Sequence, residues 1–294
     1  MRALFTALIA WTLAACSPTA PRGELSREPA IWRITDSDSE IWLYGSSHLL
    51  PPSLRWRGPR LEAAFAAAEE LVTETDTSAE TGAVFVDLAQ RYGRLPVGES
   101  LSTRLTPEDG ARLAQAARSL GLDPAALDQQ RPWLTALQLS VAAATRAGHS
   151  AEAGVEAVLT PEARARGMRV SYLETAEQQI QVLAGLPPEE EARFLSLTLR
   201  DIDQGAATMA EMDDAWVRGD VAALECLLAA QWREAGPAIH DAVIIARNRA
   251  WADDVTARLE GSGRVFIVVG AAHLVGEDSL VDLLRERGIV VEGP

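Results

Sequence analysis

Short apolar runs and longer amphipathic stretches alternate along the chain, and the two patterns predict strands and helices respectively. The most apolar runs, at 41–44 and 265–269, are rich in β-branched and aromatic residues and are each followed by a glycine, which is typical of buried strands. A polar turn at 36–40 separates the first run from another at 31–35, so we expect a β-hairpin there. Further strands are expected at 71–76, 169–174 and 289–291.

The centre of the chain has helical spacing. Thr106 followed by Pro107 and two acidic residues is a strong helix start, and Gly121 ends that helix. Further helices are expected at 61–70, 132–147, 155–166 and 277–287, and in succession from 176 to about 260. The terminal strand–helix–strand segment, 265–291, predicts a βαβ unit with a parallel strand pair. We therefore expect a mixed α/β fold in one domain, 30–294, with a central sheet built from N- and C-terminal segments and a long helical insertion.

The charge of the chain excludes several classes of function. A formal net charge of −15 makes nucleic acid an unfavourable partner. All 27 basic residues are arginine, so Schiff-base chemistry and a P-loop lysine are both excluded.

The first 29 residues have the pattern of a targeting segment. A positive charge at Arg2 precedes an apolar stretch that is short for a membrane-spanning helix, and 13–16 resembles a bacterial lipobox. We expect a lipoprotein signal peptide over 1–15, lipidation of Cys16, and a Pro- and Gly-containing tether over 16–29. The protein would then be anchored by lipid in the bacterial cell envelope, at the outer membrane facing the periplasm. The alternative is an ordinary secretory peptide with a cysteine nearby.

Two matching motifs follow the two most apolar strands. Gly45 precedes His48 by three residues, and Gly270 precedes His273 in the same way. Each histidine is therefore expected at the carboxyl end of its strand, where open α/β sheets bind ligands. A histidine in such a loop is often structural, but two of the four histidines in the chain occupy this position. We expect them to share one site.

Two neutral imidazoles and a carboxylate would suit a divalent transition metal with open positions for water and substrate. The candidate ligands are His48, His273 and Glu74, and the candidate metals are Mn, Co and Zn. Such a metal activates water and polarises a carbonyl, which suits hydrolysis. Glu174 and Glu156 occupy comparable positions, and Arg247 could direct its guanidinium at a substrate carboxylate or a developing oxyanion. The zinc motif His-Glu-x-x-His and the hydrolase motif Gly-x-Ser-x-Gly are both absent.

Six short segments, in this order, resemble the successive motifs of the TraB/GumN family, which includes the Tiki metalloproteases and is related to erythromycin esterase and ChaN-like proteins. They lie at 44–51, 71–74, 154–156, 172–175, 247–248 and 269–276. The resemblance implies a shared α/β fold with His48, His273 and Glu74 at a common centre and Arg247 nearby. Glu156 departs from the more common aspartate but keeps the charge. Around this centre we expect Gly45, Gly270, Asn248 and Glu174 to contact the substrate.

The leading hypothesis is a lipid-anchored, metal-dependent hydrolase, a peptidase or an enzyme for a small-molecule substrate. One alternative is a metal-free hydrolase in which a histidine is the general base, as in the esterase relatives. The other is a binding protein that holds a metal, haem or small ligand without turnover. The sequence leaves the metal, the substrate and the oligomeric state open.

Overall fold

The computed structural model describes residues 28–204 and 207–294. Its sheet has six strands in the order β4-β3-β5-β2-β1-β6. Their bounds are β1 Ile31–Thr35, β2 Ser39–Ser46, β3 Glu70–Thr73, β4 Arg169–Tyr172, β5 Gly263–Gly270 and β6 Val291–Glu292. The strands β1 and β2 form the expected antiparallel hairpin, and β2, β5, β3 and β4 run parallel.

Helices fill the sequence between the strands. The confirmed helix after Thr106, for example, has the Thr106 side chain accepting from the amide of Asp109, and Gly121 ends it with a positive φ of 70°. The helices are α1 Pro59–Ala67, α2 Ala79–Gly93, α3 Pro107–Leu120, α4 Pro124–Leu127, α5 Pro132–Arg146, α6 Val155–Ala165, α7 Ala176–Ala184, α8 Pro188–Gln204, α9 Ala207–Val217, α10 Val221–Ala235, α11 Pro237–His240, α12 Ala246–Leu259 and α13 Leu280–Glu286. The expected α/β fold with a long helical middle region is confirmed, and β4 divides that helical region into two parts.

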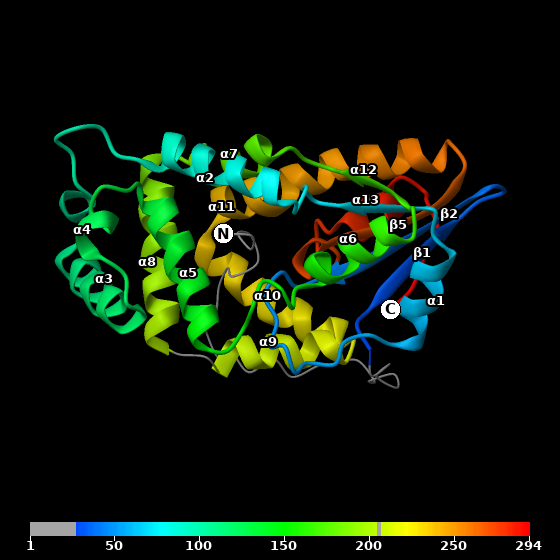
Figure 1. The fold of residues 1–294 in the computed structure, drawn as a ribbon, viewed down its shortest axis with the longest axis horizontal. Coiled ribbons are helices and arrows are strands. Elements are labelled where there is room, and N and C mark those ends of the chain that lie inside the picture. The colour runs from blue at the N-terminus through cyan, green and yellow to red at the C-terminus, as the bar shows by residue number, and fades with distance from the viewer. Residues whose placement is uncertain (1–27, 205–206) are drawn as a thin grey trace.

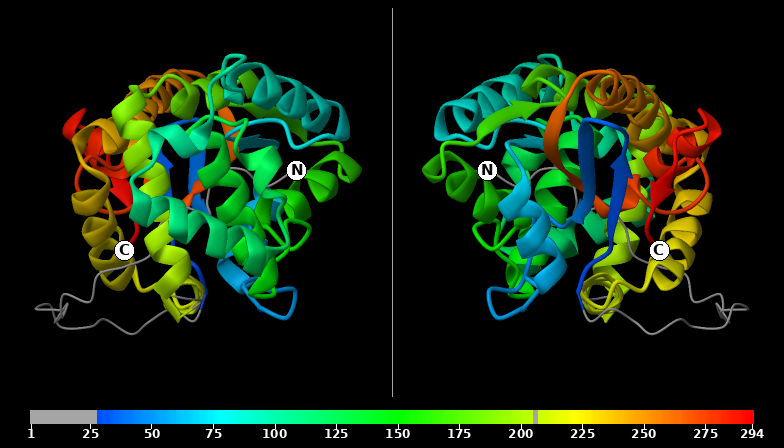
Figure 2. Two further views of the ribbon diagram at one scale, coloured as in Figure 1. Left: turned by 90° about the vertical axis from the view of Figure 1, so that its left-hand side faces the viewer. Right: turned by 90° about the vertical axis from the view of Figure 1, so that its right-hand side faces the viewer.

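The parallel strands are joined by helices on both faces of the sheet. Connections from β2 through α1 to β3 and from β3 through α6 to β4 move one way across the sheet, and those through α12 and α13 move the other way. Because such crossovers are right-handed, the two pairs of helices must cover opposite faces. The end-on views show α1 and α6 on one side of the strands and α12 and α13 on the other (Figure 2).

The expectation of a parallel strand pair at the end of the chain is wrong. Strand β6 pairs antiparallel with β1, with Arg33 opposite Glu292 and Ile34 opposite Val291. Both edges of β5 are already occupied by β2 and β3, so the strand after α13 can join the sheet only at an outer edge. The helix itself is shorter than expected, because the side chain of Ser279 caps it by accepting from the amide of Asp282.

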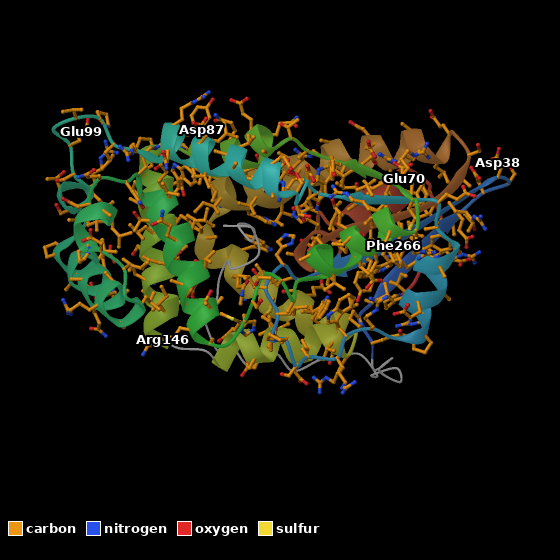
Figure 3. The ribbon with its side chains drawn as sticks, in the orientation of Figure 1. Asp38, Glu70, Asp87, Glu99, Arg146 and Phe266 are labelled. Carbon is orange, nitrogen blue, oxygen red and sulfur yellow. The ribbon has the colours of Figure 1, made fainter. Side chains whose placement is uncertain are left out.

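The elongated molecule has an α/β end and a helical end (Figure 1). Each end has its own apolar core. At the α/β end, the ring of Phe266 on β5 lies 5.7 Å from that of Phe65 on α1, and Figure 3 shows Phe266 among the strands. At the helical end, Trp133 of α5 and Phe194 of α8 are fully buried. Partly buried Trp232 and Ala272 pack against both cores.

Membrane attachment concerns a part of the chain that the structure does not cover. The proposed signal peptide, the proposed lipidation site Cys16 and most of the proposed tether lie outside the described residues. Over 28–204 and 207–294, no helix combines the length and the apolar character that a membrane crossing requires.

Candidate functional site

The predicted site residues follow the carboxyl ends of four parallel strands. His48 lies just beyond β2, His273 beyond β5, Glu74 beyond β3 and Glu174 beyond β4. Adjacent strands β2 and β5 continue into helices on opposite faces, which opens a crevice at their ends. The topology therefore brings these four side chains to the same edge of the sheet.

Glu74 is the centre of the cluster and is 3% exposed. Its Oε1 accepts a hydrogen bond of 2.7 Å from the backbone N–H of Gly270, and its Oε2 accepts one of 2.7 Å from Arg247. The Nε2 atoms of His48 and His273 each lie 4.0 Å from Oε1, so they are at most twice that distance apart. The structure therefore places the two histidines beside the same carboxylate.

Arg247 joins the other members of the cluster and is buried. It follows a π-helical segment, η2 Asp241–Ile245, a rare local geometry that recurs at functional sites. Besides Glu74, its guanidinium donates to both carboxylate oxygens of Glu174, at 2.8 and 2.9 Å, and lies 3.0 Å from Nε2 of His273. Burial opposes the charge, but the two carboxylates raise the pKa of Arg247 above its ordinary value, so it is a permanent cation.

Burial alone would raise the pKa of Glu74, but Arg247, the two histidines and the amide of Gly270 lower it well below its ordinary value. Glu74 is therefore an anion. Burial raises the pKa of Glu174, and the hydrogen bonds from Arg247 act in the opposite direction. Glu174 was expected to contact substrate, and the structure places it against Arg247.

His273 is held as a neutral ring. Its Nδ1 lies 2.7 Å from Oδ1 of Asn248, whose amide nitrogen donates to the carbonyl of Asp278 at 2.8 Å. This orientation of the amide puts the ring proton on Nδ1 and leaves Nε2 to accept from Arg247. Burial, with Arg247 as a second cause, lowers the pKa of His273 to about 3. Asn248, the single asparagine of the chain, therefore positions His273 and is itself fully buried.

His48 has the opposite charge state. Its Nδ1 lies 2.9 Å from Oε2 of Glu156, in the first turn of α6, and Ser46 donates to the other oxygen of that carboxylate. Burial alone would lower the pKa of His48, but Glu156 and Glu74 raise it to about 9. At neutral pH the site therefore combines an imidazolium at His48 with a neutral imidazole at His273.

The described arrangement does not fit a metal held by His48, His273 and Glu74. The acceptor nitrogen of His273 already faces a guanidinium, and both oxygens of Glu74 accept hydrogen bonds. The permanent charge of Arg247 would also repel a divalent cation. Among residues 28–204 and 207–294, no group of three or more His, Cys, Asp or Glu side chains is arranged to hold a metal ion. The metal stays a prediction for direct metal analysis.

The two motif glycines contact protein in this arrangement. The amide of Gly270 binds Glu74. A Cβ added at Gly45 would lie 3.1 Å from the Cα of Ala271, so the missing side chain allows β2 to approach the segment after β5. The carbonyl of Gly45 accepts a 2.7 Å hydrogen bond from the indole of Trp216.

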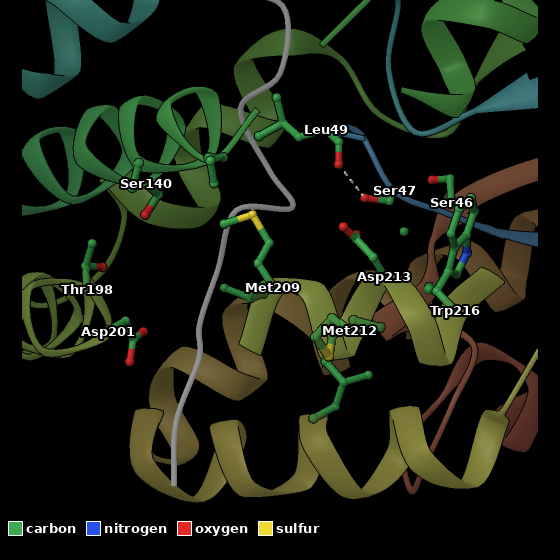
Figure 4. A pocket seen from close by; sticks show the side chains of 18 of the residues that line it. Ser46, Ser47, Leu49, Ser140, Thr198, Asp201, Met209, Met212, Asp213 and Trp216 are labelled. Carbon is green, nitrogen blue, oxygen red and sulfur yellow. Dashed lines mark hydrogen bonds between the residues drawn. The ribbon is translucent and has the colours of Figure 1, made fainter. Parts of the chain in front are cut away.

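Beside the cluster lies a cavity of about 470 Å³ that reaches Glu74, Gly270 and His273. Its size is that of a small-molecule site. Figure 4 shows its side chains, which come from α5, α8, α9 and α10 as well as from the strand ends. The apolar part of the wall includes Leu49, Met209, Met212, Trp216, Leu228 and Trp232.

Sequence reasoning missed this wall and missed Gln179, whose amide donates to Glu74 at 3.2 Å. Apolar helix positions look alike in sequence whether they line a cavity or fill a core. The sequence did contain a signal for Ser46, because this residue lies inside the first histidine motif.

Comparison with known proteins places the chain in a family. The model of the TraB/PrgY/gumN family matches residues 30–293. The chain belongs to this family. YbaP of Escherichia coli (strain K12) is 28% identical over 266 residues, which cover 90% of this chain and 96% of that protein. YbaP of Shigella flexneri has the same identity and coverage, and both are described as uncharacterized. No solved structure matches the chain. TraB/PrgY/gumN membership confirms the resemblance drawn from the six motifs.

Proposed function

We propose that this protein is a hydrolase of esters or amides that uses His48 as its general acid–base and that works, anchored by lipid, in the bacterial cell envelope. The observation that carries the proposal is the placement of His48. It lies between the carboxylates of Glu156 and Glu74, at the ligand-binding edge of the sheet, where the cavity reaches Glu74 and His273.

The chemistry needs a base and then an acid at one position. In its deprotonated form, which is the minor form below about pH 9, His48 would take a proton from water at Nε2 while the water oxygen bonds to the substrate carbonyl carbon. The protonated ring would then return that proton to the departing alcohol or amine as the carbonyl–leaving-group bond breaks. Glu156 orients the ring, as the carboxylate does in other histidine-based sites. Arg247 keeps Glu74 ionised, and Glu74 in turn favours the protonated ring.

A ligand-binding protein without turnover is the second candidate. One observation favours it: Arg247 and its two carboxylates already pair with one another, and Asn248 and Arg247 hold both nitrogens of His273. A fully paired buried network can serve to shape a pocket without chemistry. The apolar wall of the cavity would suit such a use equally well.

The test is a screen of aryl and alkyl esters, amides and short peptides with the purified mature protein. Turnover by the wild type should fall at least about a hundredfold in His48→Gln, because general acid–base catalysis contributes roughly that much or more. His240→Gln is the matched control, since His240 is half-buried and is not among the described residues that line the cavity. It should keep wild-type rates.

Metal analysis runs beside the screen, with assays in EDTA and with added Mn²⁺, Co²⁺ or Zn²⁺. Turnover that survives EDTA supports the metal-free route. Turnover that needs a metal present in stoichiometric amount would replace it with the metal-dependent hypothesis. Absence of turnover under all of these conditions would rule out the hydrolase proposal and leave the ligand-binding candidate.

A further inference from the structure

We infer that the cavity binds the protonated amine of an apolar ligand, with the carboxylate of Asp213 as the recognition group. The inference deepens the proposed function and rests on it, because it names a substrate class for the same site. Asp213 belongs to α9, and its side chain lines the cavity and is 14% exposed. Figure 4 shows it among the side chains that line the cavity, with Met209 and Met212 of the same helix.

Asp213 is held in place by a residue from a different part of the fold. Its Oδ2 lies 2.7 Å from Nε2 of His149, which is 7% exposed and follows α5. The next residue, Ser150, pairs through its backbone with Leu50, just after His48. The carboxylate is therefore tied to the loop that carries His48.

The ring of His149 orients the carboxylate of Asp213 from one side. Nδ1 of His149 is buried and has no hydrogen-bond partner among the residues that the structure describes. The ring contacts the carboxylate of Asp213 through Nε2.

The other charged groups of the described lining determine the sign of the charge inside the cavity. Glu74 is neutralised by Arg247, and Asp201 adds a further carboxylate. Arg146, the basic side chain of this lining, is exposed and donates to the carbonyl of Ser119, and Figure 3 shows it at the outer surface of the helical end. The interior of the cavity therefore combines apolar walls with negative charge.

An ammonium group on a hydrocarbon body matches this combination, because it supplies a positive charge and three donors beside apolar surface. For the proposed hydrolase the corresponding substrates are aminoacyl esters and amides, including short peptides with a free amine. The acetylated form of such a compound has the same apolar body without the charge, so the two forms isolate the role of the carboxylate.

The experiment is calorimetric titration of the folded mature protein with leucinamide and with N-acetyl-leucinamide. The wild type should bind leucinamide at least about tenfold more tightly, the range of a hydrogen bond to a charged group. Asp213→Asn keeps the side-chain shape and should abolish this preference. Asp214→Asn should preserve it, because Asp214 is 59% exposed and pairs with Arg218.

Equal binding of the two compounds by the wild type, or binding of neither, would overturn the inference without reference to any variant. A preference that survives in a folded Asp213→Asn protein would overturn it as well. The titration needs no turnover. Selective binding of leucinamide without cleavage of leucine esters would therefore rule out the hydrolase proposal and still support the amine-binding site.

Discussion

At the scale of single residues, two histidines in matching sequence motifs differ in charge because their neighbours differ. The neighbour of His48 is a carboxylate, Glu156, whereas His273 has a guanidinium on one nitrogen and an amide on the other. Opposite shifts of the two pKa values, to about 9 and about 3, follow from these contacts. A pair of groups whose environments drive their pKa values apart is a recurring feature of acid–base sites.

The pKa of His48 can be tested directly. In a histidine NMR titration, the wild-type His48 signal should titrate near pH 9, and Glu156→Gln should lower its pKa toward the ordinary 6.5 because the amide carries no charge. The pairing also stabilises the folded chain. That contribution is complete below pH 6.5, where the unfolded ring is protonated as well, and it is lost as the pH rises through about 9.

The control for this titration is Glu152→Gln, which removes an equal charge from an exposed carboxylate that binds Ser150. It should leave the His48 pKa near its wild-type value. A wild-type pKa near 6.5, or a Glu156→Gln variant that titrates like the wild type, would contradict the assignment. Neither measurement depends on finding a substrate.

The site was only partly predictable at this scale. The strand-ending positions of His48, His273 and Glu74 follow from local pattern, and the structure brings the three together. The roles of Asn248 and Glu156 do not follow from local pattern, because they depend on contacts between residues far apart in sequence. Asn248 holds His273 from 25 positions away, and Ser46 reaches Glu156 across 110.

At the scale of elements, the start of α6 sets the geometry around His48. The amide of Val155 donates to the carbonyl of Ser47 at 3.1 Å, and Glu156 follows in the first turn. Gly154, immediately before the helix, packs against the backbone of His48. A Cβ added there would lie 2.7 Å from the carbonyl carbon of His48, closer than real side chains approach.

Gly154→Ala should therefore push α6 away from the His48 loop. The expected cost is about 1–3 kcal/mol in the free energy of unfolding, the usual range for overpacking, measured by denaturant titration. The pKa of His48 should also fall, since Glu156 moves with the helix. Gly110→Ala is the matched control: Gly110 lies within α3 and has open space around it, so alanine should be neutral or stabilising. Equal stability of the two variants would refute this account of the contact.

Most elements were predictable because their signals are local. The cap at Thr106 and the glycine at the end of the same helix are examples. The partner of β6 was not predictable in this way. A βαβ pattern predicts that two strands run in the same direction. The position of the second strand in the sheet depends on which strand edges are already occupied, and β2 and β3 occupy both edges of β5.

At the scale of the whole molecule, the helical segments after β3 and β4 supply most of the cavity wall at the end of the sheet that carries the site. The chemistry-bearing residues and the recognition surface therefore come from different parts of the chain. The histidines and Glu74 follow strand ends, with Glu156 and Arg247 added from α6 and α12, whereas other helices supply most of the cavity wall. This division explains why the motifs marked the charged centre in the sequence while the cavity had no sequence signature.

The proposed attachment to the membrane also concerns the whole molecule, and it would depend on Cys16. The family match begins at residue 30, so the segment before it is available for targeting and tethering. If Cys16 is lipidated, acyl chains provide the anchor, because a surface with net charge −15 gains nothing from anionic lipid. Cys16→Ser should then lose labelling by a palmitate analogue and leave the membrane fraction, with the domain still folded. Ser17→Ala should behave as the wild type. Wild-type protein recovered unlabelled and wholly in the soluble fraction would rule out the lipid anchor.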